Sequence, residues 1–276
     1  MFVAEMQHGG LSGWAQNSQC VHATGTSLTA PFTRAGTVVS PWCHGPVALR
    51  DPKDGEWLLF HVGSGPGPSG AAAANSSGFM HHAPSPDGPW VPHAGPTPGG
   101  CNMPTAAFHP NGTLFAVCGN GDALTSAPSR HGAWTAQRAL GKEKHWEDPT
   151  LWFDRRGNFH VIFHVYSLQP FAAGDWSVAS GHMFSKDGVE WHRSSAQPFN
   201  GSVDFTDGTT RNYATRERPQ LVFTDRGRHT PMALISSVSS QPIGHVCDTC
   251  TQHACSQCKV TPGRDWTFTI VQPLRV

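Results

Sequence analysis

The sequence has few charged residues, and neither sign of charge predominates. Charged residues make up 14% of the 276 residues, and 19 Lys and Arg balance 19 Asp and Glu. A nucleic-acid-binding domain is expected to carry a basic patch or a recognisable motif, and this sequence has neither. No apolar stretch reaches the roughly 18 residues needed to cross a bilayer. We therefore expect neither nucleic acid nor a membrane as a partner.

Long stretches with apolar residues at helical spacing are also missing. The alanine run at 71–74 is short and follows a glycine. Glycine and proline number 30 and 23, and there are 10 tryptophans. This composition is typical of an all-β domain rich in turns. One sizeable core is feasible at this length, so residues 1–276 are interpreted as a single domain.

A short pattern occurs four times: a residue followed by proline, an apolar run, a turn and a second apolar run. Proline suits the first residue of a strand, because no donor of the hydrogen-bond ladder is lost there. Pairs such as Asn111-Gly112 supply the positive φ angles of tight hairpin turns. Each copy therefore predicts a hairpin, and its innermost strand opens at Pro46, Pro104, Pro149 or Pro219.

A second pattern closes each unit, with a turn and then an aromatic residue. The aromatics are spaced 44 to 75 residues apart, at Phe32, Trp90, Trp134, Trp191 and Trp266. Repeats of roughly 40 to 50 residues with four strands each are typical of β-propellers. Five closing aromatics predict a five-bladed β-propeller. Only four openings accompany them, so we expect the first blade to be incomplete.

Two of the four openings carry carboxylates, in Glu147-Asp148-Pro149 and Glu217-Arg218-Pro219. Hydrolysis of a glycosidic bond needs two carboxylates that face each other across the sugar. The repeat places these carboxylates at equivalent positions of two units. For either motif alone, the alternative is an acid that merely opens a surface strand. Neighbours on a strand face opposite ways, so we expect Asp148 rather than Glu147 to reach a shared site.

These motifs resemble the five-bladed propeller of glycoside hydrolase family 43 and its relatives, the arabinanase, levansucrase and invertase type. The resemblance covers about residues 18–276. Its most specific parts are Trp146-Glu147-Asp148-Pro149, the segment 180–185 before Asp187-Gly188, and Arg216-Glu217-Arg218-Pro219.

In that family an Asp acts as general base, a second Asp tunes the pKa of the acid, and a Glu is the general acid. The resemblance implies that Asp148 is the tuning residue and that Glu217 is the acid. It further implies inverting hydrolysis of a plant- or algal-type polysaccharide or oligosaccharide.

The general base has no counterpart among the four openings, because Gly45 and Met103 precede the first two prolines. Either an inner strand that holds the base is missing before residue 1, or Gly45 occupies the place of the base. In both cases we expect weak hydrolysis or none. The alternative function is a non-catalytic propeller that binds carbohydrate or protein.

Four more side chains near inner-strand starts are candidates for contacting a sugar, and core packing is the alternative for each: Trp42, His44, Trp146 and His164. His164 lies four residues after His160, on the same face of the expected strand. We expect no cofactor, although a structural or axial metal ion is left open.

Eight cysteines favour an oxidising compartment. Four of them form a dense cluster in a loop insertion at about 239–264: Cys247, Cys250, Cys255 and Cys258. Disulfides are expected there in preference to zinc, because the gap between the pairs is too short for an ordinary zinc ribbon. Cys43 and Cys101 each precede an inner strand, so we expect these two to meet near the axis.

Three glycosylation sequons, at Asn75, Asn111 and Asn200, agree with a glycoprotein of the secretory pathway. The first six residues do not resemble a signal peptide, because they lack a basic start and a long apolar segment. We expect an extracellular monomer.

Overall fold

The computed structural model describes residues 1–6, 18–63, 78–98, 101, 104–119, 124–138, 140, 146–165, 180–213, 215–224, 228–239 and 268–274. These residues form strands and turns, with no helix among them. Accordingly, no helix in the described part of the chain is long and apolar enough to span a membrane. The all-β prediction is confirmed.

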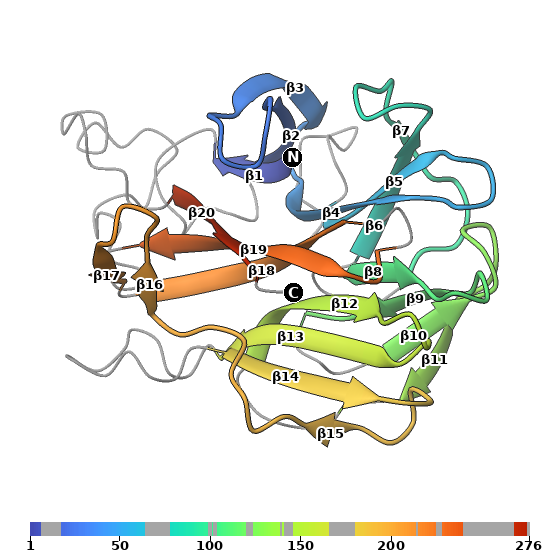
Figure 1. Ribbon diagram of the computed structural model, residues 1–276. Coiled ribbons are helices and arrows are strands. Elements are labelled where there is room, and N and C mark those ends of the chain that lie inside the picture. Colours follow the sequence, from blue (N-terminus) through green and yellow to red (C-terminus); the bar gives the residue numbers. More distant parts are fainter. Residues whose placement is uncertain are drawn as a thin grey trace, which may run out of the picture.

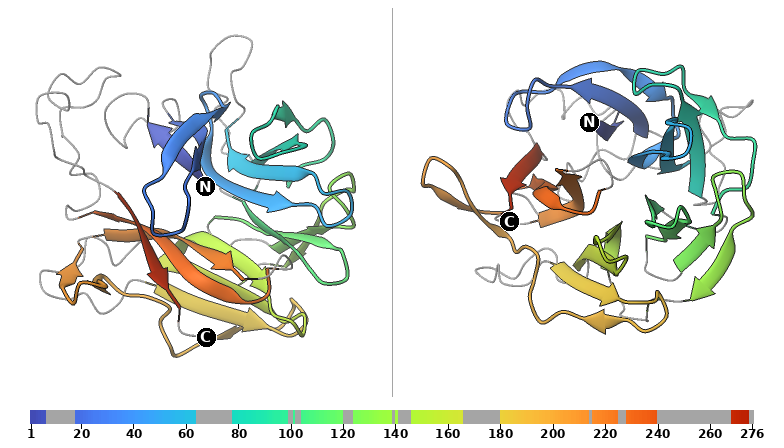
Figure 2. Two further views of the ribbon diagram at one scale, coloured as in Figure 1. Left: turned by 45° about the horizontal axis from the view of Figure 1, so that its top comes forward. Right: turned by 45° about the vertical axis from the view of Figure 1, so that its right-hand side comes forward.

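The strands form five blades around one axis, each an antiparallel sheet of strands consecutive in the chain (Figures 1 and 2). The first blade contains β1 (Phe2–Met6), β2 (Ser18–Thr24) and β3 (Thr33–Val39). The second contains β4 (His44–Arg50), β5 (Trp57–Val62), β6 (Gly78–Ala83) and β7 (Val91–Pro92). The third contains β8 (Thr105–Phe108), β9 (Leu114–Val117), β10 (Leu124–Ala127) and β11 (Thr135–Arg138).

The fourth blade contains β12 (Trp146–Phe153), β13 (Phe159–Val165), β14 (Ser180–Ser185) and β15 (His192–Arg193). A separate hairpin follows, made of β16 (Ser202–Asp204) and β17 (Thr210–Asn212). The fifth blade contains β18 (Thr215–Phe223), β19 (Pro231–Ser239) and β20 (Phe268–Pro273). The five-bladed propeller predicted from the repeats is therefore present, and its first and fifth blades have three strands each among the described residues.

Hydrogen bonds between different blades join the inner strands β4, β8, β12 and β18. The Thr150 hydroxyl donates to the carbonyl oxygen of Pro219. The amide nitrogen of Leu151 donates to Thr105 Oγ1 at 3.3 Å, and Gln220 Nε2 donates to the carbonyl oxygen of Pro46 at 3.4 Å. The inner strands next to the repeated prolines thus meet at the axis, as the repeat predicts. The prolines do not open all of these strands, however, because β4, β12 and β18 begin before Pro46, Pro149 and Pro219.

The closing tryptophans pack between neighbouring blades. Trp134 of the third blade lies edge-on to Phe60 of the second, with ring centroids 6.2 Å apart. Trp90 of the second blade meets Phe2 of the first in the same way, at 5.5 Å. Aromatic edge-to-face contacts of this kind add to the stabilisation gained by burial alone. These indoles therefore help to hold adjacent blades together.

Two disulfides lie in the described part of the chain, Cys20–Cys43 and Cys101–Cys118. Cys43 and Cys101, which we expected to meet near the axis, are not bonded to each other. Cys43 precedes β4 and bonds to β2 of the preceding blade, whereas Cys101 bonds to Cys118 just after β9 of the third blade. The cluster at Cys247, Cys250, Cys255 and Cys258, with almost all of the insertion around it, lies outside the described residues.

Candidate functional site

Three inner strands begin with the same distortion of the backbone. In β12, Glu147 pairs with His164 and Thr150 pairs with Ile162, so two residues of β12 oppose one residue of β13. The same two-against-one bulge interrupts β4 after His44 and β18 after Glu217. Bulges of this type bend a strand and redirect its side chains. Three of the four x-Pro openings are therefore copies of one local geometry, and residues 102 and 103 of the fourth lie outside the described residues.

The residue before each proline adopts a positive φ angle: 59° at Gly45, 49° at Asp148 and 53° at Arg218. Side chains rarely adopt this region, and glycine does so at least cost. Asp148 and Arg218 are held there by the surrounding sheet. Gly45, Asp148 and Arg218 thus occupy one equivalent position of the repeat, and His44, Glu147 and Glu217 occupy the position before it.

This geometry corrects the expectation that Glu147 and Asp148 face opposite ways. One oxygen of each carboxylate and a ring nitrogen of His164 lie within 4.8 Å of one another. His164 Nδ1 is 3.4 Å from Asp148 Oδ2, and His164 Nε2 is 3.8 Å from Glu147 Oε2. Alternation fails here because it assumes regular extended backbone, and the positive φ angle at Asp148 breaks the period. Both carboxylates belong to the site.

Arg218 links the two predicted halves of the site. Its Nη1 lies 3.4 Å from Asp148 Oδ1, and its Nη2 donates to His44 Nε2 at 2.9 Å. His44 is 3% exposed, and burial, reinforced by the charge of Arg218, lowers its pKa well below the usual value. A neutral imidazole is what accepts a hydrogen bond from a guanidinium. The sequence places Arg218 in the motif Arg216-Glu217-Arg218-Pro219 but gives no signal of this linking role.

His164 is buried to the same degree as the hydrophobic core around it. Burial lowers its pKa to about 4, although Asp148 acts in the opposite direction. The ring is therefore neutral at physiological pH. Each of its two ring nitrogens lies close to one of the two carboxylates.

Among the described residues, Glu217 is the carboxyl group whose pKa is raised most. Burial, together with the nearby charges of Asp148 and Glu147, raises its pKa to about 7 against the opposing effect of Arg218. A carboxyl group that loses its proton only near neutrality can donate that proton in the range where enzymes work.

The ligand atoms of Glu147, Asp148 and His164 are also close enough together to coordinate a metal ion. Arg218 already supplies a positive charge to Asp148 from the neighbouring strand. A cation would have to share Asp148 with that guanidinium. We therefore interpret the cluster in terms of proton transfer.

The two candidate tryptophans lie in the core of the protein. Trp146 is 3% exposed and packs against Phe163, with ring centroids 4.3 Å apart, and Trp42 is 5% exposed. Little of the surface of either indole is exposed for a sugar to contact. Their roles in substrate binding remain predictions. The structure brings Asp148, His44 and His164 together around Arg218, and electrostatics couple Glu217 to Asp148 and Arg218.

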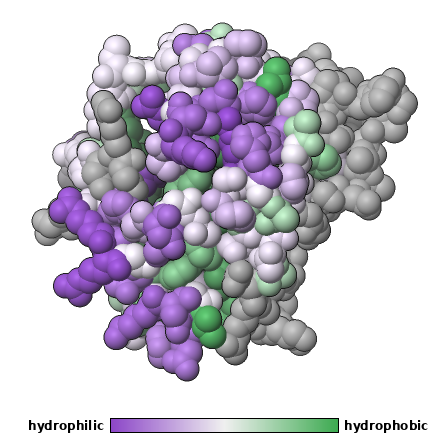
Figure 3. All heavy atoms as spheres, turned by 90° about the vertical axis from the view of Figure 1, so that its right-hand side faces the viewer, coloured by the Kyte–Doolittle hydropathy of each residue, from purple (hydrophilic) through white to green (hydrophobic). Residues whose placement is uncertain are grey.

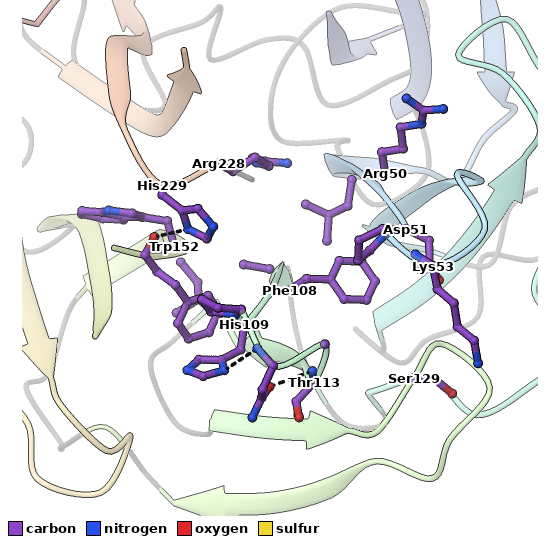
Figure 4. A pocket seen from close by; sticks show the side chains of 18 of the residues that line it. Arg50, Asp51, Lys53, Phe108, His109, Thr113, Ser129, Trp152, Arg228 and His229 are labelled. Carbon is purple, nitrogen blue, oxygen red and sulfur yellow. Dashed lines mark hydrogen bonds between the residues drawn. The ribbon is translucent and has the colours of Figure 1, made fainter. Parts of the chain in front are cut away.

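A cavity of about 620 Å³ lies at the opposite end of the inner strands, where the hairpins turn (Figure 4). It is lined by side chains of several blades, including Arg50, Lys53, His109, Trp152 and Arg228. The face onto which these turns project carries many hydrophilic residues (Figure 3). None of the three carboxyl groups described above lines this cavity, and sequence reasoning did not anticipate it.

No protein-family model matches this chain, and no curated protein matches it either. Solved structures do. A β-1,3-galactosidase of glycoside hydrolase family 43 aligns over 87% of this chain and 50% of its own, with 13% identity and a TM-score of 0.53. The endo-arabinase from Bacteroides thetaiotaomicron aligns over 94% of this chain and 86% of its own, with 13% identity and a TM-score of 0.55.

A family 117 glycoside hydrolase from the marine bacterium Zobellia galactanivorans aligns over 93% of this chain and 69% of its own, with 12% identity and a TM-score of 0.53. The chain spans about half the length of the galactosidase. At these identities the likeness concerns the fold, which is the five-bladed propeller of the glycoside hydrolases in families 43 and 117.

Proposed function

We propose that this protein is a glycoside hydrolase that acts with inversion on a plant- or algal-type polysaccharide or oligosaccharide. The observation that carries the proposal is Glu217, a partly buried carboxyl group whose pKa is raised to about 7 by its burial and by the charge of Asp148. The two residues stand at the bulged starts of β18 and β12, inner strands that are hydrogen-bonded to each other.

In the proposed reaction Glu217 protonates the glycosidic oxygen as the bond to the sugar breaks. Water attacks the anomeric carbon from the opposite face, which inverts its configuration. Burial and the charge of Asp148 keep Glu217 protonated, and Arg218 limits that effect. Arg218 also holds Asp148 in place, while the neutral His44 accepts a hydrogen bond from the same guanidinium.

The named activities of the structural neighbours support a carbohydrate ligand and indicate which substrates to test first. They include a β-1,3-galactosidase and an endo-arabinase. The two disulfides support an extracellular location, since such bonds persist in oxidising compartments.

The proposal is tested by incubating the purified chain with arabinan, β-1,3-galactan and aryl glycosides of arabinofuranose and galactose. Proton NMR during the first minutes reports the anomeric configuration of the released sugar. We expect weak hydrolysis of at least one substrate, with inversion. Release of the retained anomer contradicts the inverting mechanism. Binding of a polysaccharide without any hydrolysis identifies the non-catalytic propeller instead.

A further inference from the structure

The proposed reaction requires a group that takes a proton from the attacking water. The position where the repeat would place that group, directly before Pro46, carries no side chain that can accept a proton. Gly45 occupies, in β4, the place that Asp148 occupies in β12. A glycine offers no carboxylate. This inference rests on the proposed function and concerns which side chain activates water.

Two other groups near the first and second blades do not fill this role. The carboxylate of Glu5, in β1, accepts hydrogen bonds from Arg34 Nε of β3 at 3.1 and 3.2 Å. It accepts another from Gln19 Nε2 at 2.6 Å. These bonds lower the pKa of Glu5, mainly through Arg34, so it is a poor base. His44 directs Nε2 toward the guanidinium of Arg218.

Glu147 has the properties that the role demands. The bulge brings its carboxylate to the side of the strand where Asp148 and His164 lie. Its side chain is 36% exposed, whereas that of Asp148 is 9% exposed. A water molecule therefore has access to Glu147, while Asp148 is enclosed and in contact with Arg218.

We propose that Glu147 is the general base of the reaction. As the glycosidic carbon–oxygen bond breaks and the water oxygen bonds to the anomeric carbon, one water proton passes to Glu147 and the proton of Glu217 passes to the leaving oxygen. Return of a proton from Glu147 to Glu217 through solvent restores the enzyme. No oxidant, reductant or further reactant is needed.

The acidities of the two glutamates suit this division of roles. Burial raises the pKa of Glu147, with a smaller contribution from Asp148, but the large rise, to about 7, is at Glu217. Glu217 therefore keeps its proton up to near-neutral pH, as a general acid must. The exposure and position of Glu147 assign it the role of the base.

The leaving group distinguishes the two roles. Glu147→Gln should lower kcat about 100-fold or more on natural oligosaccharides and on dinitrophenyl glycosides alike, since water must be activated whatever the leaving group. Glu217→Gln should spare the hydrolysis of the dinitrophenyl glycosides.

Glu190→Gln, on an exposed turn of the fourth blade, is the matched control and should have the activity of the wild type. A Glu147→Gln enzyme within threefold of the wild type on both substrates would overturn the assignment and leave the proposed function standing.

A second pair of variants keeps the test independent of folding. Glu147→Ala with sodium azide should form a glycosyl azide of inverted configuration, because the small anion fits where the carboxylate was. Adding Gly45→Asp to the Glu147→Gln variant should raise its activity at least tenfold. If the wild type is inactive and Gly45→Asp alone creates activity, Glu147 is not the base. If no variant hydrolyses any substrate, the proposed function itself fails.

Discussion

The starts of β4 and β12 share a backbone and differ in their side chains. Both have the same two-against-one bulge, and both place a residue with positive φ directly before a proline. In β12 the bulge presents Glu147 and Asp148, and in β4 it presents His44 and Gly45. The proline and the bulge therefore determine where side chains enter the axis, and the two residues before the proline determine what they do there.

The strand start β18 is intermediate between these two. It presents one carboxyl group, Glu217, and one cation, Arg218, and the cation contacts both other strand starts. The comparison therefore predicts that exchanging the two residues before the proline changes chemistry while leaving the fold intact. The following predictions test that statement, from the largest effect to the smallest.

The largest effect is expected for Glu217→Gln. Hydrolysis of natural oligosaccharides should fall by about 10²- to 10⁴-fold, because no carboxyl group remains to protonate the leaving oxygen. Initial rates on a natural oligosaccharide and on a dinitrophenyl glycoside measure the effect. An equal loss on both substrates would assign Glu217 a role other than proton donation.

Asp148→Asn and Arg218→Met should shift the acidity of Glu217 in opposite directions. The charge of Asp148 raises the pKa of Glu217 and that of Arg218 lowers it. The alkaline limb of kcat/KM should therefore move to lower pH in Asp148→Asn and to higher pH in Arg218→Met, each by roughly one pH unit. Shifts in the same direction would show that the limb does not report Glu217.

Acidic solution should destabilise the fold. Burial lowers the pKa of His61 to about 3 and that of His81, His164 and His182 to about 4. Each is neutral in the folded state and becomes protonated more readily when unfolded, so stability is present above about pH 6.5 and is lost as the pH falls toward 4. The free energy of unfolding should fall by about 1 kcal/mol or more per pH unit in that window. Urea unfolding at several pH values measures it, and a flat profile contradicts this account.

Exchanging residues at the position with positive φ should have small effects on stability. Gly45→Ala should lower the free energy of unfolding by about 1 kcal/mol, because a residue with a Cβ then adopts a positive φ angle. Asp148→Gly should relieve a similar cost but lose the contact with Arg218. Thermal unfolding at pH 7 measures both. A loss of several kcal/mol for Gly45→Ala would mean that β4 and β12 do not share one backbone geometry.

Most of the fold was predictable because its signals are local. A proline before an apolar run, a glycine or asparagine turn and a closing aromatic each have a direct physical cause, and their repetition gives the number of blades. The pairing of Cys20 with Cys43 was not predictable in this way. It depends on how two consecutive blades lie side by side, which no local pattern encodes.

The site was predictable in part. That the strand starts carrying Asp148 and Glu217 meet at the axis follows from the repeat, but the orientation of Glu147 does not. A residue before proline is expected to be extended, and in an extended strand Glu147 and Asp148 point apart. The bulge overrides both rules, and nothing in Glu147-Asp148-Pro149 alone reveals it. The one available signal in the sequence is that the motif of two residues before a proline recurs, at His44-Gly45-Pro46 and at Glu217-Arg218-Pro219.

The pH dependence of kcat/KM for the wild type on two substrates tests the central claim most directly. On an unactivated oligosaccharide the rate should fall as the pH rises through about 7, because Glu217 then loses the proton that the leaving oxygen needs. On a dinitrophenyl glycoside that fall should be absent. A fall at the same pH on both substrates, or on neither, would contradict the assignment of Glu217 as the acid at the axis of this propeller.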